Sequence, residues 1–223
     1  MSENKVLPLE AIQFVMNPSP RLPCVLLLDT SESMIGAKMR GLNEALRTFS
    51  ESLRKSHAKL GVEIAVVGFG PARIISPFTT ADEFCPPILT TSKSRPMGAA
   101  VRMGISMVEA RKALFKKWGI GYFKPWIFMI ANGSSTDEVS TTAALVHKSE
   151  VEKKLYFYTV GVDHADMKAL SLLSAQRTPL MLRGCQFNRL FDWLSYALIS
   201  VAIGPYPVTL PDPLGPNGWA ERV

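Results

Sequence analysis

Hydrophobic residues in this chain fall into two patterns, short continuous runs and stripes with helical spacing. Residues 25–28 and 126–130 are continuous apolar runs, which is typical of strands buried on both faces of a sheet. A stripe at intervals of three or four lies between them: Met39, Leu42, Leu46, Phe49 and Leu53. This spacing predicts a helix with one apolar face.

The rest of the chain continues the alternation of strands and helices. Further strands are predicted at 62–69, 74–75, 155–160 and 180–182, and further helices at 101–115, 137–148, 166–173 and 187–201. The segment at 74–75 follows the preceding strand so closely that only a hairpin connects them, which makes it an antiparallel edge strand. Asp166 is predicted to cap the helix that follows it.

Strands separated by helices of this length predict right-handed crossovers and a mostly parallel, doubly wound α/β sheet. In such sheets, ligands bind at the carboxyl ends of the strands. We divide the chain into an N-terminal arm (1–21), a single domain (22–203) and a C-terminal tail (204–223). The tail is rich in proline and glycine and is expected to lie on the surface.

Composition indicates one soluble globular domain in the cytoplasm. The chain has 223 residues, of which 47% are hydrophobic and 20% charged, with no apolar run long enough for a membrane span and no secretory signal. Its three cysteines, Cys24, Cys85 and Cys185, are far apart in the sequence. We interpret them as reduced core residues.

The net charge of +6 does not by itself indicate nucleic-acid binding, because lysine and arginine are scattered along the chain. The densest basic cluster, at 111–117, is interpreted as the solvated end of a helix. Nucleic acid and membrane are therefore not expected as partners.

No enzyme signature is complete in this sequence. Gly68-Phe69-Gly70 lacks the third glycine of a dinucleotide-binding turn, because Arg73 stands in its place. Asp163-His164 is a potential acid–base pair at the functional end of the sheet, but no nucleophile accompanies it. We predict a protein that is not an enzyme.

The loop after the first strand carries the most informative chemistry. Asp29, Ser31 and Ser33 bring a carboxylate and two hydroxyls at alternate positions. Oxygen ligands of this kind suit the octahedral coordination of magnesium. Serine and threonine before a helix also cap its free N–H groups, so the residues alone leave both interpretations open.

The sequence PCVLLLDTSESM (23–34) resembles the D-x-S-x-S signature of von Willebrand factor A (vWA) domains, and more closely the bacterial TerY-like branch associated with tellurium-resistance operons. The resemblance continues through PPILTTS (86–92), PMGAAV (96–101), 135–138 and 160–167, and reaches 218–220. It implies a Rossmann-like three-layer α/β/α fold with a six-stranded sheet in the order 3-2-1-4-5-6.

The same resemblance implies a metal-ion-dependent adhesion site, but this sequence departs from its pattern. Asp29, Ser31 and Ser33 match the ligands of the first loop. Arg95 stands where a threonine ligand is expected, and Asn132 stands where an aspartate is expected.

An arginine offers only donors and a permanent positive charge. We therefore expect Arg95 to take the place of the ion, paired with Asp29 and bonded to oxygens of Ser31, Ser33 and Asn132. No cofactor is expected, and magnesium is disfavoured; if an ion binds, Asp29, Ser31 and Ser33 would hold it. Thr136-Asp137 is interpreted as a cap for the helix that follows.

By this resemblance the chain is a protein-interaction module of a bacterial stress system like that for tellurite resistance. Its partner would be a protein such as a phosphatase or kinase of the same operon. Four residues are expected at the partner-facing rim: Glu32, Met34, Lys93 and Met97. Two alternatives remain: a magnesium-dependent vWA binder whose partner supplies an acidic ligand, and an RNA-associated vWA domain.

Overall fold

Strands and helices alternate along the chain in this computed structural model, which describes residues 9–174, 176–204 and 209–222. The strands are β1 (Leu22–Leu28), β2 (Val62–Phe69), β3 (Ala72–Thr80), β4 (Trp126–Ala131), β5 (Tyr156–Val162), β6 (Leu180–Leu182) and β7 (Ala220–Glu221). The helices are α1 (Leu9–Met16), α2 (Ala37–Lys55), α3 (Met97–Trp118), α4 (Ser140–Val151), α5 (Met167–Leu173) and α6 (Phe187–Ile203), with a short 3₁₀ turn, η1 (Glu32–Met34).

The seven strands form one sheet in the order β3-β2-β1-β4-β5-β6-β7. The predicted order of the first six strands and the antiparallel pairing of β3 with β2 are confirmed. The sheet has one strand more than the six that were expected, because β7 pairs antiparallel with β6. Both edges of the sheet are therefore antiparallel and its centre is parallel.

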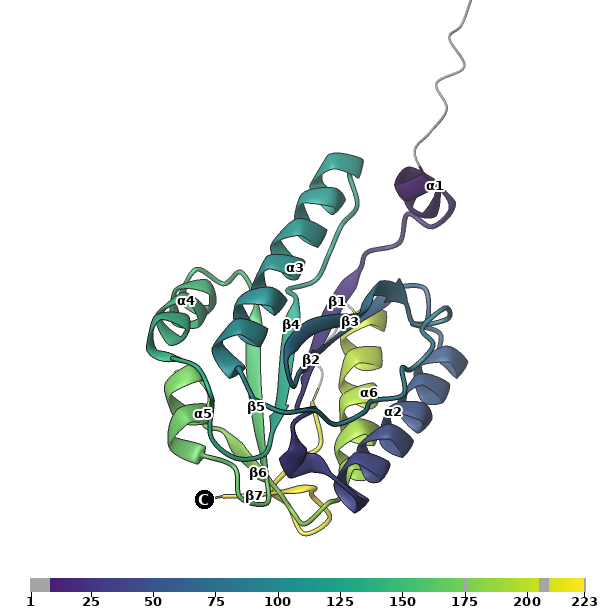
Figure 1. Cartoon of the computed structure of the whole chain (residues 1–223). Coiled ribbons are helices and arrows are strands. Elements are labelled where there is room, and N and C mark those ends of the chain that lie inside the picture. Colours follow the sequence, from purple (N-terminus) through teal and green to yellow (C-terminus); the bar gives the residue numbers. More distant parts are fainter. Residues whose placement is uncertain (1–8, 175, 205–208, 223) are drawn as a thin grey trace, which may run out of the picture.

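Helices cover both faces of the sheet (Figure 1), with α3, α4 and α5 on one face and α2 and α6 on the other. Successive residues of β1 alternate between the two cores. Cys24 and Leu26 pack with residues of α2 and α6, while Val25 and Leu27 pack with residues of α3. This two-sided burial explains why β1 is a continuous apolar run in the sequence.

Two short elements near the chain ends were not predicted. In α1, Phe14 packs edge-on against Phe115 of α3, with 5.8 Å between the ring centroids. Near β7, the buried Trp219 packs against Trp193 of α6 at 5.7 Å. Of the predicted arm and tail, residues 1–8, 205–208 and 223 lie outside the described residues.

Two sequence-based interpretations need correction. Cys24 is a buried free thiol as expected, but Cys85 and Cys185 are exposed, because they lie in connections outside the two cores. Arg111 in the cluster at 111–117 is not solvated. It is buried against the carboxylate of Glu63 in β2, with N–O distances of 2.7 and 2.8 Å.

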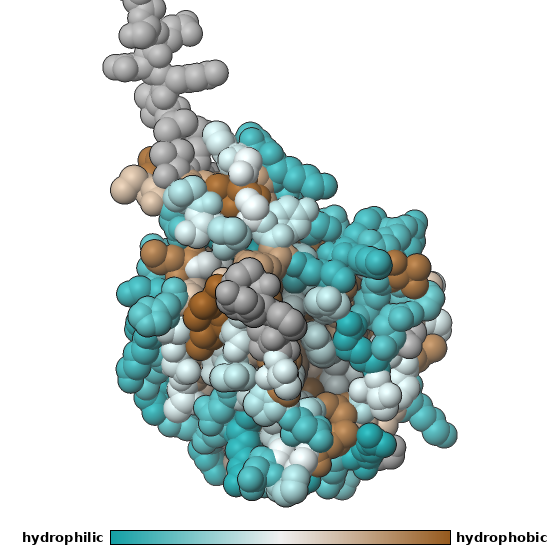
Figure 2. Space-filling model, turned by 180° about the vertical axis from the view of Figure 1, so that it is seen from behind, coloured by the Kyte–Doolittle hydropathy of each residue, from teal (hydrophilic) through white to brown (hydrophobic). Residues whose placement is uncertain are grey.

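The side of the molecule seen from behind is largely hydrophilic (Figure 2), and on its described part the hydrophobic residues lie in separate patches. Within the described ranges, no helix has both the length and the apolar character needed to cross a membrane.

Candidate functional site

Asp29 lies at the carboxyl end of β1, where the chain leaves the centre of the sheet. Its side chain is fully buried. One carboxylate oxygen accepts the backbone N–H of Ser31, and the other accepts the backbone N–H of Asn132, each at 2.8 Å. Burial raises the pKa of Asp29 above its ordinary value, and the hydrogen bonds from Ser31 and Asn132 and the charge of Arg95 oppose that rise.

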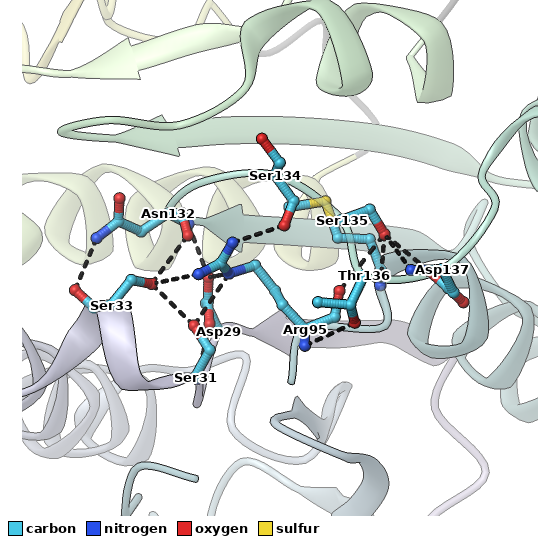
Figure 3. Close-up of polar contacts among 10 residues, drawn as sticks. Asp29, Ser31, Ser33, Arg95, Asn132, Ser134, Ser135, Thr136 and Asp137 are labelled. Atoms are coloured by element: carbon cyan, nitrogen blue, oxygen red, sulfur yellow. Dashed lines mark hydrogen bonds and ion pairs between the residues drawn. The ribbon is translucent and has the colours of Figure 1, made fainter. Parts of the chain in front are cut away.

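Arg95 comes from the loop before α3, and its guanidinium lies over the first loop (Figure 3). Nε donates to the hydroxyl of Ser31 and Nη2 donates to the hydroxyl of Ser33, both at 3.0 Å. Nε also lies 3.3 Å from a carboxylate oxygen of Asp29. The structure thus brings Asp29, Ser31, Ser33 and Arg95 together, and the arginine side chain is only 17% exposed.

Each of the two serine hydroxyls both donates and accepts a hydrogen bond in this arrangement. Ser33 donates its proton to the backbone carbonyl of Asn132 at 2.9 Å. Because each hydroxyl has one proton, Ser31 is then the donor in the 2.8 Å bond between the two hydroxyls. Both oxygens also accept an N–H of Arg95, so each hydroxyl donates once and accepts from the guanidinium.

Asn132 does not bond to Arg95 as expected. Its side-chain amide donates instead to the backbone carbonyl of Ser33 at 2.9 Å. The third guanidinium bond goes to the backbone carbonyl of Ser134, which accepts from Nη1 at 2.6 Å. This carbonyl could not be predicted from the sequence, because any residue type can supply it.

Gly133 makes room for the guanidinium. Its φ of +92° lies in the region that favours glycine, and a Cβ atom there would lie 2.5 Å from Nη1 of Arg95. A larger residue at 133 would therefore displace the arginine side chain. Sequence reasoning did not identify this role of Gly133.

The loop that carries Ser134 is fastened to α3 by Asp137. The two carboxylate oxygens of Asp137 accept the backbone N–H groups of Gly98 and Ala99, at 2.9 and 2.8 Å. Asp137 therefore caps α3, and the expectation that it caps the following helix α4 is wrong. The backbone N–H of Arg95 donates to the hydroxyl of Thr136 at 2.9 Å, which joins the two loops a second time.

Only part of the expected rim lies at the surface. Glu32 and Lys93 are exposed. Met34 and Met97 are completely buried, because Met34 turns into the core with α2 and Met97 packs against the sheet under α3. The expectation that these two methionines face a partner is therefore wrong, and they belong to the packing beneath the site loops.

The Asp163-His164 pair lies in the loop after β5. Asp163 accepts a hydrogen bond from Lys38 at 2.8 Å, which lowers its pKa. His164 is largely exposed, with Nε2 3.5 Å from Asp163. The carboxylate is engaged by a lysine of α2 and is not arranged to act as the partner of a catalytic base.

A divalent cation fits this set of side chains poorly. Asp29 is the one carboxylate in the group, and the hydroxyls of Ser31 and Ser33 already accept from Arg95. Across the described ranges, no group of three or more His, Cys, Asp or Glu side chains is arranged to hold a metal ion. A cation at Ser31 and Ser33 would have to displace a guanidinium that carries the same sign of charge.

Solved structures that share this fold include a vWA domain. The pilus adhesin SpaC from Lactobacillus rhamnosus GG matches 82% of this chain and 30% of its own, with a TM-score of 0.65 and 10% identity. A von Willebrand factor type A structure from Catenulispora acidiphila matches 81% and 43%, with a TM-score of 0.62 and 13% identity. Proximal thread matrix protein 1 from the mussel byssus, with a zinc-occupied MIDAS motif, matches 81% and 48%, with a TM-score of 0.52 and 15% identity.

The expected fold class is thereby confirmed: the chain has the vWA fold. It spans less than half of the length of each of these three structures. No model of a protein family matches the sequence, and no curated protein matches it.

Proposed function

We propose that this chain is a non-enzymatic protein-interaction module whose adhesion-type site is closed by an arginine and works without a metal ion. The observation that carries the proposal is the guanidinium of Arg95 lying on Ser31 and Ser33, 3.3 Å from the carboxylate of Asp29. Fold alone does not define function, so the proposal rests on this arrangement of side chains.

The charge of Arg95 argues for an ion-free site. At a separation of 4 Å and an effective dielectric constant of about 20, two like unit charges repel by about 4 kcal/mol. A divalent cation would meet this repulsion, and Asn132 provides no carboxylate to offset it. The guanidinium of Arg95 therefore takes the place of an exchangeable metal ion, and the site loops stay fixed whatever the metal concentration.

The docking face that we propose consists of the exposed residues around Arg95. Glu32 and Lys93 stand at its rim with opposite charges, so a partner with complementary charges would be held in one orientation. The exposed Ser134 and Thr136 lie in the loop that Arg95 fastens.

The resemblance to TerY-like sequences supports a regulatory or scaffold role in a bacterial stress system of the tellurite-resistance kind. A phosphatase or kinase of the same operon is the partner that this resemblance favours. The pilus adhesin among the similar structures supports the broader proposal of protein binding.

A magnesium-dependent binder is the second candidate, and a specific observation favours it. Asp29, Ser31 and Ser33 keep the residue types and the spacing of the D-x-S-x-S signature. In this alternative, an acidic side chain of the partner would complete the coordination of the ion.

Affinity capture on the immobilised chain distinguishes the two candidates. We expect the immobilised chain to retain a protein in EDTA and the Lys93→Glu variant to lose it. Arg40→Glu, on the exposed side of α2, is the matched control and should retain the protein as the natural chain does. Retention only with magnesium would favour the second candidate, and equal retention by both variants would contradict the docking face. Bound nucleic acid that is released steeply with salt would favour the RNA-associated alternative.

A further inference from the structure

A polar cavity of about 240 Å³ lies next to the Arg95 site, where the end of β1, the β2–β3 hairpin and the loop before α3 meet. Six of the residues that line it are Thr30, Gly70, Arg73, Thr90, Thr91 and Ser92. Its position is fixed by the backbone, because the N–H of Ser92 donates to the carbonyl of Thr30 at 2.8 Å. Ser92 also pairs with Ser31 in a parallel bridge.

The polar side chains of this cavity are all potential donors. Four of them carry hydroxyls, and the fifth is the guanidinium of Arg73. No carboxylate lines the cavity, and within the described chain neither the four hydroxyls nor Arg73 has a side-chain hydrogen bond or an ion pair. A cavity with this lining has affinity for an anion rich in acceptor oxygens.

Thr30 is the most enclosed residue of the cavity lining. Only 4% of this residue is exposed, and within the described ranges its hydroxyl has no protein hydrogen-bond partner. Since Thr30 lines the cavity, its hydroxyl is free to donate to a molecule bound there.

Gly70 brings the hairpin close enough to form the cavity wall. A Cβ atom at this position would lie 2.3 Å from the backbone oxygen of Thr30, so only glycine permits the approach. The Gly68-Phe69-Gly70 sequence, which is not a dinucleotide-binding turn, has a structural explanation in this contact. The hairpin in turn carries Arg73 to the cavity.

We propose that this cavity binds a phosphoryl group, either as free phosphate or on a phosphorylated serine or threonine of a protein partner. Arg73 presents a planar fork that matches two phosphate oxygens, and the hydroxyls of Thr30, Thr91 and Ser92 donate to the remaining acceptors. The inference depends only on this cavity and does not require that Arg95 closes the neighbouring site.

Calorimetric titration of the whole chain tests the proposal with two probes, inorganic phosphate and O-phospho-L-threonine, at ionic strength matched with chloride. We expect saturable binding of at least one probe, weakened on the order of ten-fold or more by Arg73→Met and by Thr30→Val. Thr30→Ser, which keeps the hydroxyl, and Arg40→Met, an exposed arginine outside the cavity, should bind like the natural chain.

The two probes distinguish the source of the phosphoryl group. Tighter binding of O-phospho-L-threonine supports a phosphorylated partner, whereas binding of inorganic phosphate alone supports the free ion. The proposal is overturned if neither probe binds above the chloride control, or if Arg73→Met binds as tightly as the natural chain. If Thr30→Ser bound the probes as weakly as Thr30→Val, the Thr30 hydroxyl would have no role in binding.

Discussion

Two buried carboxylates, one at each end of the sheet, pair with arginines in different ways. Glu63 lies near the start of β2, and both of its oxygens accept N–H groups of Arg111, at 2.7 and 2.8 Å. Asp29 lies at the end of β1, and its oxygens accept backbone N–H groups instead. Arg95 is close to Asp29, but the three hydrogen bonds of its guanidinium go to two hydroxyls and a backbone carbonyl.

The Arg111–Glu63 ion pair therefore stabilises the fold, whereas the charge of Arg95 occupies the candidate site. Glu63 depends on its arginine, because removal of Arg111 would leave a buried carboxylate whose one remaining cationic partner among the described residues is the more distant Arg21, 3.5 Å away. Asp29 would keep both of its backbone hydrogen bonds without Arg95. Arg95 is therefore expected to matter more for what the site binds than for whether the chain folds.

The largest predicted effect concerns the fold. Arg111→Met should lower the free energy of unfolding by about 3 kcal/mol, because an uncompensated buried carboxylate is strongly destabilising. Chemical denaturation followed by circular dichroism measures this change. The double variant Glu63→Leu, Arg111→Met should recover part of the loss, and a single variant as stable as the natural chain would refute the role assigned to the pair.

A smaller effect is predicted for the site. Arg95→Met should lower the free energy of unfolding by about 1–2 kcal/mol, from the loss of charge-assisted hydrogen bonds by a partly exposed side chain. The same denaturation measurement applies. A loss as large as that of Arg111→Met would mean that Asp29 depends on Arg95, and no loss at all would contradict the placement of the guanidinium.

The smallest predicted effect is a dependence on pH. Burial raises the pKa of Asp29, and Arg95 opposes that rise, so Arg95→Met should raise this pKa further. Above both folded-state pKa values Asp29 is ionised in both proteins, and the variant has its full deficit in stability. As the pH falls through these values towards the ordinary pKa of aspartate, about 4, Asp29 is protonated and the deficit should shrink.

Denaturation midpoints of the natural chain and the Arg95→Met variant across this pH range measure the effect. The same comparison between the natural chain and Arg111→Met is the control, because the ion pair of Arg111 with Glu63 does not involve Asp29. A deficit of Arg95→Met that grows as the pH falls would contradict the stated sign.

Much of the fold was predictable because burial on both faces leaves a clear sequence pattern. The runs that became β1 and β4 cannot be exposed on either side, and β2 was predicted with its observed bounds. The two-residue β7 has no such pattern, since it forms only where Trp219 docks on the sheet. Arg111 was misjudged because a buried arginine and a solvated one look alike until its partner, Glu63, is brought near by the fold.

The candidate site was predictable where side chains carry the chemistry. Asp29, Ser31, Ser33 and Arg95 were expected together, and the structure brings them together. The carbonyl of Ser134 and the space above Gly133 could not be predicted, because they depend on backbone conformation. Met34 and Met97 were placed at the rim because they adjoin site loops, and sequence position did not indicate which way their side chains turn.

Calorimetric titration with magnesium and manganese tests the central claim most directly, applied to the natural chain and to the double variant Arg95→Thr, Asn132→Asp. Our account predicts no binding by the natural chain and a gain of binding by the double variant. At about 100 times the dissociation constant, that gain should stabilise the double variant by about 2.7 kcal/mol. Tight binding of magnesium by the natural chain would contradict the account and make an ion-bridged acidic partner the leading candidate.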